Sequence, residues 1–166
     1  MTGPILVAYA SRYGSTREVA ESVAATLRER RLKVELLPAG EVRTLDPYGG
    51  VVLGGGIYVG RWHRDARGFV RHFRDALERV PVAAFGMGPV EDTRQQRTGS
   101  ERQLARQLAK LPVEPFAVQV FGGSVDPAKL RFPFNRMPAA DIRDWDEIHD
   151  WAVVVAERFE AVPALA

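Results

Sequence analysis

The sequence predicts a single α/β domain with a doubly wound parallel sheet and helices on both faces. Five apolar stretches of strand length recur along the 166 residues, and helical patterns separate most of them. Strands that read as continuous apolar runs are typical of a parallel sheet buried on both faces. The length suits one full core, so we treat residues 1–166 as one domain.

The first half of the chain begins with an apolar strand at residues 5–9. Residues 15–30 place apolar side chains at helical spacing, which predicts a helix, and residues 34–37 form a second apolar strand. The stretch 38–47 is short and broken by prolines, so we expect a turn or a single helical turn there. Residues 51–53 form the third strand, which ends at a run of three glycines.

The second half continues the alternation. Residues 64–79 carry apolar side chains at helical spacing, and residues 81–85 form the fourth strand. After a polar loop, residues 100–111 are predicted to be helical, and residues 116–121 form the fifth strand. A long irregular connection follows before the closing helix at residues 145–159.

Composition excludes several kinds of chemistry. With no cysteine, the chain has no disulfide, no thiolate nucleophile and no Cys-ligated metal. The three histidines are too scattered to indicate a zinc site, and a net charge of +2 does not indicate nucleic-acid binding. No apolar run approaches the length of a bilayer span and the first residues lack a signal-peptide pattern, so we expect a cytoplasmic protein.

A phosphate-binding loop is predicted between the first strand and the first helix. Ser11, Ser15 and Thr16 offer hydroxyl groups, and the backbone N–H groups from Arg12 onward converge at a helix N-terminus. Gly14 allows a tight turn where a side chain would crowd the anion. The loop has no lysine, so it is not the G-x-x-x-x-G-K-[ST] loop of nucleotide triphosphate sites.

An ordinary helix cap is the alternative interpretation of the same residues. Ser15 and Glu18 have the spacing of a capping box, in which each side chain accepts from the other's backbone N–H group. Capping boxes are common at helix starts. The choice between the two interpretations therefore depends on the rest of the chain.

Three loops meet at the carboxyl ends of the predicted strands, where ligands bind in sheets of this kind. They cover residues 10–15, 54–63 and 86–98. A dinucleotide site would need G-x-G-x-x-G after the first strand, and a hydrolase elbow would need G-x-S-x-G. A phosphoacceptor domain would need acidic residues after the first strand. None of these is present, and the remaining combination suits a mononucleotide with a large planar ring.

The segment Ser11-x-Tyr13-Gly14-Ser15-Thr16 resembles the phosphate loop of flavodoxins, with Tyr13 in place of a hydroxylic residue. The resemblance implies a flavodoxin-like domain whose five-stranded parallel sheet has the order 2-1-3-4-5, with FMN as the cofactor. It also implies that residues 54–62 and 86–92 cover the two sides of the isoalloxazine ring. The cofactor-binding residues expected on this basis are Ser11, Arg12, Tyr13, Gly14, Ser15, Thr16, Gly55, Gly56, Ile57, Tyr58, Gly60, Gly86, Met87 and Gly88.

A second pattern resembles the bacterial menaquinone-dependent protoporphyrinogen IX dehydrogenases. It comprises Val51-Val52-x-Gly54-x-x-Ile57-x-x-Gly60-x-x-His63 followed by Phe69-Val70, the pair Asp144-Trp145, and the basic-aromatic segment 131–137. The resemblance implies an FMN-dependent oxidoreductase that oxidises protoporphyrinogen, a step of heme biosynthesis, with a quinone as acceptor. The connection before the last helix is shorter than in that family, and residues 87–98 share little with it. A non-catalytic electron-transfer flavodoxin and a flavin-free regulatory or interaction domain remain alternatives.

The two ring loops carry more positive than negative charge. Arg61, His63, Arg94 and Arg97 outnumber Glu91 and Asp92, and positive charge near the ring stabilises a reduced anion. This balance favours a flavin that accepts electrons from a substrate over a low-potential carrier. No residue stands out as an acid–base catalyst, and no metal site is expected.

Several side chains near the ring have two interpretations. Tyr58 and Trp62 are candidates for contact with the ring, although Trp62 also suits packing against the next helix. His63 is either a catalytic group or a helix cap. In the long connection, Phe132 and Phe134 between arginines suit a substrate or membrane-contact surface, or else a plug in the core.

The expected partners follow from these features. They are a small-molecule substrate or quinone, or a redox partner protein, with possible peripheral membrane contact and no nucleic acid. A stripe of arginines at helical spacing indicates either a solvated helix face or a surface for an acidic partner. The stripe consists of Arg64, Arg67, Arg71 and Arg74.

Overall fold

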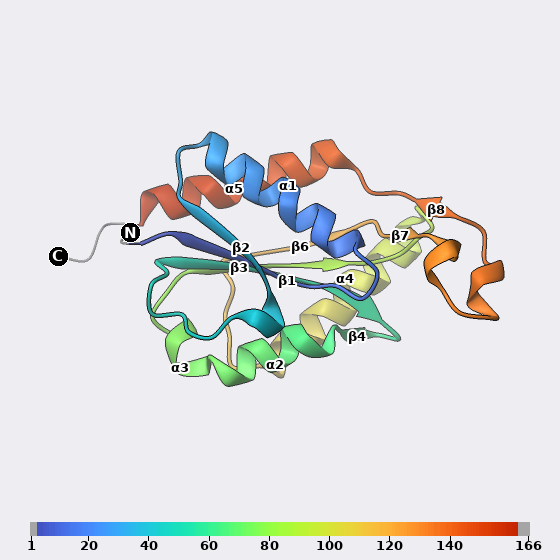
Figure 1. Cartoon of the computed structure of the whole chain (residues 1–166), viewed down its shortest axis with the longest axis horizontal. Coiled ribbons are helices and arrows are strands. Elements are labelled where there is room, and N and C mark those ends of the chain that lie inside the picture. Colours follow the sequence, from blue (N-terminus) through green and yellow to red (C-terminus); the bar gives the residue numbers. More distant parts are fainter. Residues whose placement is uncertain (1–2, 163–166) are drawn as a thin grey trace.

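A parallel sheet of long strands lies at the centre of the computed structural model, which describes residues 3–162 (Figure 1). Its strands run in the order β2-β1-β3-β5-β6. The short β4 (Arg61–Trp62) pairs antiparallel with the end of β3, so the long strands have the predicted order 2-1-3-4-5. The long strands are β1 (Ile5–Ala10), β2 (Val34–Pro38), β3 (Gly50–Tyr58), β5 (Val82–Met87) and β6 (Ala117–Phe121).

Helices cover both faces of this sheet, as predicted (Figure 1). Side chains alternate along β1, so that Ile5 and Val7 pack with α1 and α5 while Leu6 and Ala8 face the opposite side. One face carries α1 (Ser15–Glu29) and α5 (Trp145–Ala161), and the other carries α2 (Arg64–His72), α3 (Arg74–Leu77) and α4 (Arg94–Ala109). None of the helices within residues 3–162 is long and apolar enough to cross a bilayer.

The connection between β6 and α5, the 122–144 segment, has more order than the sequence indicates. Its two ends pair as the antiparallel strands β7 (Ser124–Val125) and β8 (Ala140–Asp141). Between them lie the 3₁₀ turns η2 (Pro127–Lys129) and η3 (Phe134–Arg136). The segment forms one end of the molecule, drawn in orange in Figure 1. The 3₁₀ turn η1 (Ala39–Glu41) confirms the single helical turn expected after β2.

The third strand is longer than predicted, because β3 continues through the glycine run to Tyr58. These glycines are strand residues that leave space for aromatic rings. A β-carbon at Gly54 would lie 2.0 Å from the ring of Phe85 on the neighbouring strand, and one at Gly55 would lie 2.9 Å from Nε1 of Trp62. Glycine usually interrupts a strand, which is why the sequence pattern indicated a loop here.

Two helices also depart from their predicted bounds. The helix expected at 64–79 is broken at Phe73, whose φ of −102° and ψ of 22° separate α2 from α3. The helix α4 begins at Arg94, earlier than expected, because the Thr93 hydroxyl accepts a hydrogen bond from the Gln96 backbone N–H at 3.2 Å. The first turns of α4 are polar, so apolar spacing could not reveal them.

We expect Gly54→Ala to lower the free energy of unfolding by about 3 kcal/mol, because the new methyl group collides with the buried Phe85 ring. Gly68→Ala is the matched control. Gly68 lies within α2 with no atom within 4 Å of an added β-carbon, so alanine there should stabilise the protein by about 0.5–1 kcal/mol. Urea unfolding measures both variants, and similar midpoints for the two would contradict this account of the glycine run.

Candidate functional site

A cavity with a volume of about 890 Å³ opens beyond the carboxyl ends of the strands, where the sequence places the ligand. The loop after β1, the end of β3 and the loop after β5 contribute three of its walls. The 122–144 segment contributes the fourth. The side chains and backbone that line it include Arg12, Tyr13, Ser15, Gly56, Ile57, Tyr58, Met87, Gly88, Val90, Lys129, Leu130, Arg131, Phe132, Phe134 and Met137.

The loop after β1 turns sharply into α1. Gly14, the residue before the helix, has φ of 93° and ψ of −13°, a left-handed conformation that favours glycine. The Ser11 hydroxyl accepts a hydrogen bond from the Gly14 backbone N–H at 2.9 Å, which fixes the turn. No side chain within residues 3–162 caps α1, and the helix begins after Gly14, so the capping box between Ser15 and Glu18 is wrong. The helix therefore begins with backbone N–H groups that no side chain satisfies.

Thr16, in the first turn of α1, holds a buried hydroxyl without a partner. Its side chain is only 1% exposed, and Oγ1 makes no hydrogen bond within residues 3–162. A buried hydroxyl left unpaired costs roughly 1–3 kcal/mol. An anion at this helix N-terminus would give the hydroxyl an acceptor. The unpaired Thr16 donor, the left-handed Gly14 and the uncapped helix start together fit a phosphate group.

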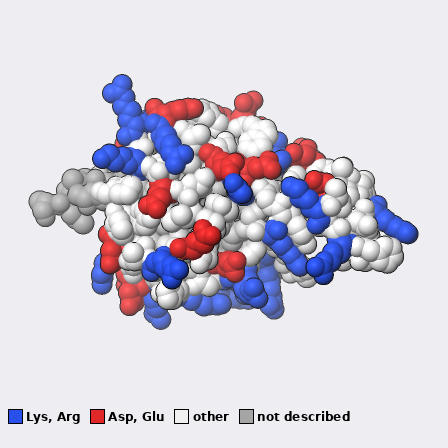
Figure 2. Space-filling model, in the orientation of Figure 1, with Lys and Arg blue, Asp and Glu red and all other residues white. Residues whose placement is uncertain are grey.

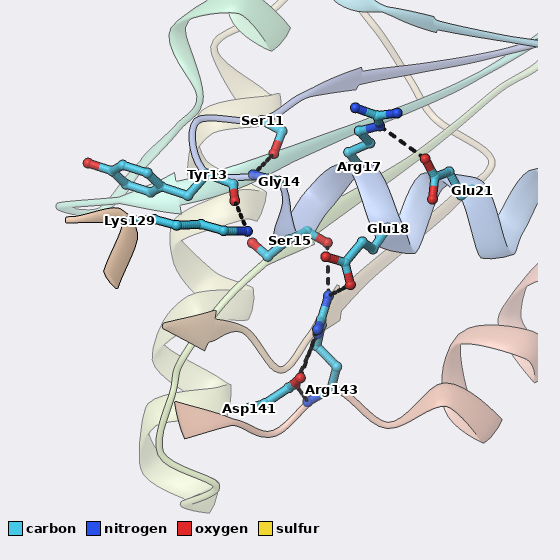
Figure 3. Close-up of polar contacts among 10 residues, drawn as sticks. All are labelled: Ser11, Tyr13, Gly14, Ser15, Arg17, Glu18, Glu21, Lys129, Asp141 and Arg143. Carbon is cyan, nitrogen blue, oxygen red and sulfur yellow. Dashed lines mark hydrogen bonds and ion pairs between the residues drawn. The ribbon is translucent and has the colours of Figure 1, made fainter. Parts of the chain in front are cut away.

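Two cations of the 122–144 segment reach this loop, as Figure 3 shows. The Lys129 ammonium donates to the Tyr13 carbonyl oxygen at 3.4 Å. The Arg143 guanidinium donates to Glu18 Oε2 at 2.9 Å and to the Ser15 carbonyl oxygen at 3.4 Å. It also forms an ion pair with its neighbour Asp141 at 2.7 Å. The loop and the segment are thus joined by side chains far apart in the sequence.

The other end of the cavity suits a planar ring. Tyr58 lines it and stands against Gly56, where an added β-carbon would lie 2.7 Å from the tyrosine ring. Burial raises the pKa of the Tyr58 hydroxyl, so this side chain stays neutral. Trp62 does not reach the cavity. It is 1% exposed, and its Nε1 donates to the Gly55 carbonyl oxygen at 3.1 Å, so it packs in the core, the alternative raised from the sequence.

The predicted cofactor-binding residues fall into three groups. Those that line the cavity are Arg12, Tyr13, Ser15, Gly56, Ile57, Tyr58, Met87 and Gly88. Ser11, Gly14 and Thr16 shape the phosphate loop beside it. The remaining glycines do not line it: Gly55 lies beneath Trp62, Gly86 lies beneath Ile57, and Gly60 lies in the turn between β3 and β4.

The positive charge of the site comes from different residues than expected. Arg61, Arg94 and Arg97 do not line the cavity, and the Arg97 guanidinium is paired with Glu147 at 2.6 Å. The cations that line it are instead Arg12, Lys129 and Arg131, against the single carboxylate of Asp126. Lys and Arg side chains also gather at this end of the molecule on the face shown in Figure 2. No local sequence pattern indicates that Lys129 lies at the site, because its position there depends on how the 122–144 segment folds.

His63 acts as a helix cap, which confirms one of its two interpretations. Its Nδ1 accepts a hydrogen bond from the Asp65 backbone N–H at 3.0 Å at the start of α2. Burial lowers the pKa of the His63 imidazole, so that it is neutral and able to accept this bond. The arginine stripe is interrupted by the break at Phe73, and Arg67 donates to the Trp62 carbonyl oxygen at 2.9 Å.

Comparisons with known proteins agree with this geometry. The chain matches the flavodoxin domain family over residues 6–138. Protoporphyrinogen IX dehydrogenase [quinone] of Escherichia coli K12 is 26% identical over 134 residues, which cover 79% of this chain and 71% of that protein. The E. coli protein is one of the relatives to which this chain is similar in sequence.

Solved structures show the same fold. A flavodoxin from Streptococcus pneumoniae TIGR4 superposes with a TM-score of 0.63 at 18% identity, covering 96% of this chain and 99% of the flavodoxin. The Flv1 flavodiiron core from Synechocystis reaches a TM-score of 0.63 at 12% identity, covering 96% of this chain and 36% of the other. The family match implies a flavin cofactor.

Acidification should destabilise the protein through His63. Because burial lowers the folded-state pKa of this imidazole, the unfolded chain binds the proton more readily, and stability falls as the pH drops below the unfolded value of about 6.5. His63→Asn keeps a cap acceptor that does not titrate. Wild type should therefore lose more stability than this variant between pH 7.5 and 5.5 in urea unfolding. Equal losses would contradict the assignment.

Proposed function

Because the chain belongs to the flavodoxin domain family, we propose that it is an FMN-dependent oxidoreductase. Its substrate would be a reduced, largely apolar molecule that bears carboxylates, of the protoporphyrinogen type, and its electron acceptor a quinone. For each pair of hydrogens that leaves the substrate, one quinone becomes a quinol. The name of the E. coli relative supports this choice of substrate and acceptor.

The residues around the cavity fit FMN. The phosphate would lie at the start of α1, where Thr16 offers its unpaired hydroxyl and Gly14 turns the backbone. Tyr58 and Met87, from the ends of β3 and β5, would border the ring. When bound, FMN supplies the redox chemistry, while the protein positions it and sets the local charge.

The observation that carries the substrate assignment is the wall formed by the 122–144 segment. Phe132 and Phe134 are 69% and 60% exposed, so they do not plug the core, the alternative raised from the sequence. Together with Met137 they line the cavity beside Arg131, and the Arg136 guanidinium lies over the Phe132 ring at 5.0 Å. Exposed apolar clusters mark interaction sites. Rings beside guanidinium groups suit an apolar body that bears carboxylates.

The charge of the cavity favours a role in accepting electrons. Arg12, Lys129 and Arg131 face it with only Asp126 to oppose them. Positive potential attracts anionic substrates and stabilises negative charge that develops on a reduced ring. A low-potential electron carrier would need the opposite arrangement. The positive cavity therefore supports oxidation of a substrate over shuttling of electrons between proteins.

Thr16→Val tests the phosphate site. Valine keeps the shape of the side chain and removes the unpaired hydroxyl, so the apoprotein should be as stable as wild type or more stable by about 1 kcal/mol. FMN affinity should fall about tenfold while riboflavin affinity stays the same, because only FMN carries a phosphate. Flavin fluorescence titrations of both variants measure this. Equal effects on the two flavins would refute a phosphate at α1.

Turnover of protoporphyrinogen with a menaquinone analogue tests the enzyme assignment. Arg131→Glu with Arg136→Glu should depress the rate at least tenfold without releasing FMN, since the substrate carboxylates then meet like charge. The same double reversal at Arg64 and Arg71, both exposed on α2, is the control and should leave the rate unchanged. Absorbance of the product and of bound flavin reports the two effects separately.

An electron-transfer flavodoxin that serves a protein partner is the second candidate. The similarity to flavodoxins, which covers 95% of this chain and 99% of each flavodoxin, favours it. In that case the wild-type protein would show no turnover with protoporphyrinogen, and would accept and donate single electrons with a flavodoxin reductase. A purified protein without yellow colour would instead favour a flavin-free regulatory domain.

A further inference from the structure

The predicted phosphate loop lacks a charge to match its ligand. A phosphate monoester carries about 1.5–2 negative charges at neutral pH. The loop between Ser11 and Thr16 offers neutral hydroxyl and N–H donors, and its one cationic side chain, Arg12, stacks over the ring of Tyr13 at 5.4 Å. The partial charge of a helix N-terminus compensates only a fraction of a phosphate.

A lysine from the far side of the cavity supplies a charge at this position. Lys129, at the end of η2, donates to the Tyr13 carbonyl oxygen at 3.4 Å, although 116 positions separate the two residues. Its Nζ would lie 3.8 Å from a β-carbon at Gly14, the residue that begins the turn into α1. The ammonium group therefore lies beside the uncapped helix start (Figure 3).

The carboxylates near Lys129 are engaged elsewhere. Glu18 and Asp141 both pair with Arg143, and the Asp126 carboxylate accepts from the Ala128 backbone N–H at 3.1 Å. Within residues 3–162, Lys129 makes no ion pair. Its charge remains available to an anion. In the first turn of the same helix, the buried Thr16 hydroxyl also lacks a partner within residues 3–162, and an acceptor at the helix start would satisfy it.

We propose that Lys129 is a phosphate-binding residue that the 122–144 segment supplies to the loop after β1. This assignment rests on the proposed binding of FMN. Because Phe132 and Phe134 follow Lys129 within a few positions on the same segment, a phosphate held by Lys129 also holds the substrate wall of the cavity in place. The phosphate end of the cofactor thus controls the order of the wall beside the ring.

Arg143 attaches one end of the 122–144 segment to the loop after β1 independently of the phosphate. Its guanidinium, 9% exposed, ties the carboxyl-terminal end of the segment to Glu18 and to the Ser15 carbonyl oxygen without any ligand. Among the hydrogen bonds of residues 3–162, Lys129 is attached to this loop by the single 3.4 Å bond to the Tyr13 carbonyl oxygen. A phosphate would add a charge-assisted contact at the weaker of the two attachments. Arg143 therefore holds the carboxyl-terminal end of the segment without a ligand, whereas the stretch around Lys129 would be held by the phosphate.

The test is a titration of the full-length apoprotein with FMN and with riboflavin. We expect Lys129→Gln to weaken FMN binding about fivefold to tenfold and to leave riboflavin binding unchanged, because riboflavin has no phosphate. Lys129→Arg should retain most of the preference for FMN. Arg131→Gln removes one charge from the same segment at a residue with no hydrogen bond to the loop after β1 within residues 3–162, so any effect it has should be equal for the two flavins. Raising the salt concentration should reduce the FMN preference in wild type more than in Lys129→Gln.

The outcomes separate this proposal from the one on which it rests. If wild type binds FMN and riboflavin equally well, the phosphate site itself is refuted, and the role of Lys129 with it. If wild type prefers FMN and Lys129→Gln keeps the full preference, FMN binding stands and the role of Lys129 is refuted. If Lys129→Gln weakens both flavins equally, the lysine only shapes the segment, which also refutes its role as a phosphate ligand.

Hydrogen exchange of residues 122–144 tests the coupling without any turnover. FMN should slow exchange across this segment more than riboflavin does at equal saturation, and Lys129→Gln should abolish the difference. The exchange of β2, which contributes no residue to the cavity lining, provides the internal reference. Equal protection of residues 122–144 by the two flavins in wild type would refute the proposal that the phosphate orders this segment.

Discussion

The contacts of Arg143 join the two parts from which the cavity is built. One part is the sheet with its loop after β1, and the other is the 122–144 segment. Arg143 ties them through Glu18, Asp141 and the Ser15 carbonyl oxygen, and its guanidinium also lies over the Trp145 ring at 5.0 Å. The Arg143 side chain is 9% exposed, so loss of both carboxylates would leave its charge largely buried and unpaired. The position of the 122–144 segment, which forms one wall of the cavity, therefore depends on Arg143, although this residue does not line the 890 Å³ cavity.

The glycine run of β3 imposes the second constraint. Phe85 occupies the space that a side chain at Gly54 would need, and Trp62 does the same at Gly55. These rings pack against the strand itself, which brings the end of β3 to the edge where Tyr58 meets the cavity. The rings of Phe85 and Trp62 thus hold the glycine run of β3 in an extended strand. The Tyr58 end of the cavity rests on core packing, whereas the end beside α1 rests on polar contacts.

The sequence predicts those features that depend on local pattern. Apolar spacing predicted the strands and their helices, and the residues after β1 predicted a tight turn into a helix, because each signal lies within a few consecutive positions. The glycine run misled the prediction of β3, since the rings that require it lie on other elements. The sources of charge were also wrong for Arg97 and Arg61. Pairing between Arg97 and Glu147, fifty positions apart, is invisible to any local pattern.

Lys129 and Arg131 place the 122–144 segment beside both the loop after β1 and the cavity wall. Lys129 lies near the phosphate loop and Arg131 lies at the cavity wall, with Phe132 next in the chain, so cofactor and substrate would contact one short stretch. Sites that order the same segment are coupled, and the coupling is reciprocal. A substrate that packs on Phe132 would then raise the affinity for FMN by the same factor by which FMN raises the affinity for the substrate. In an ordinary strand-to-helix loop of a few residues the two contacts could not be combined, which gives a physical reason for the length of this connection.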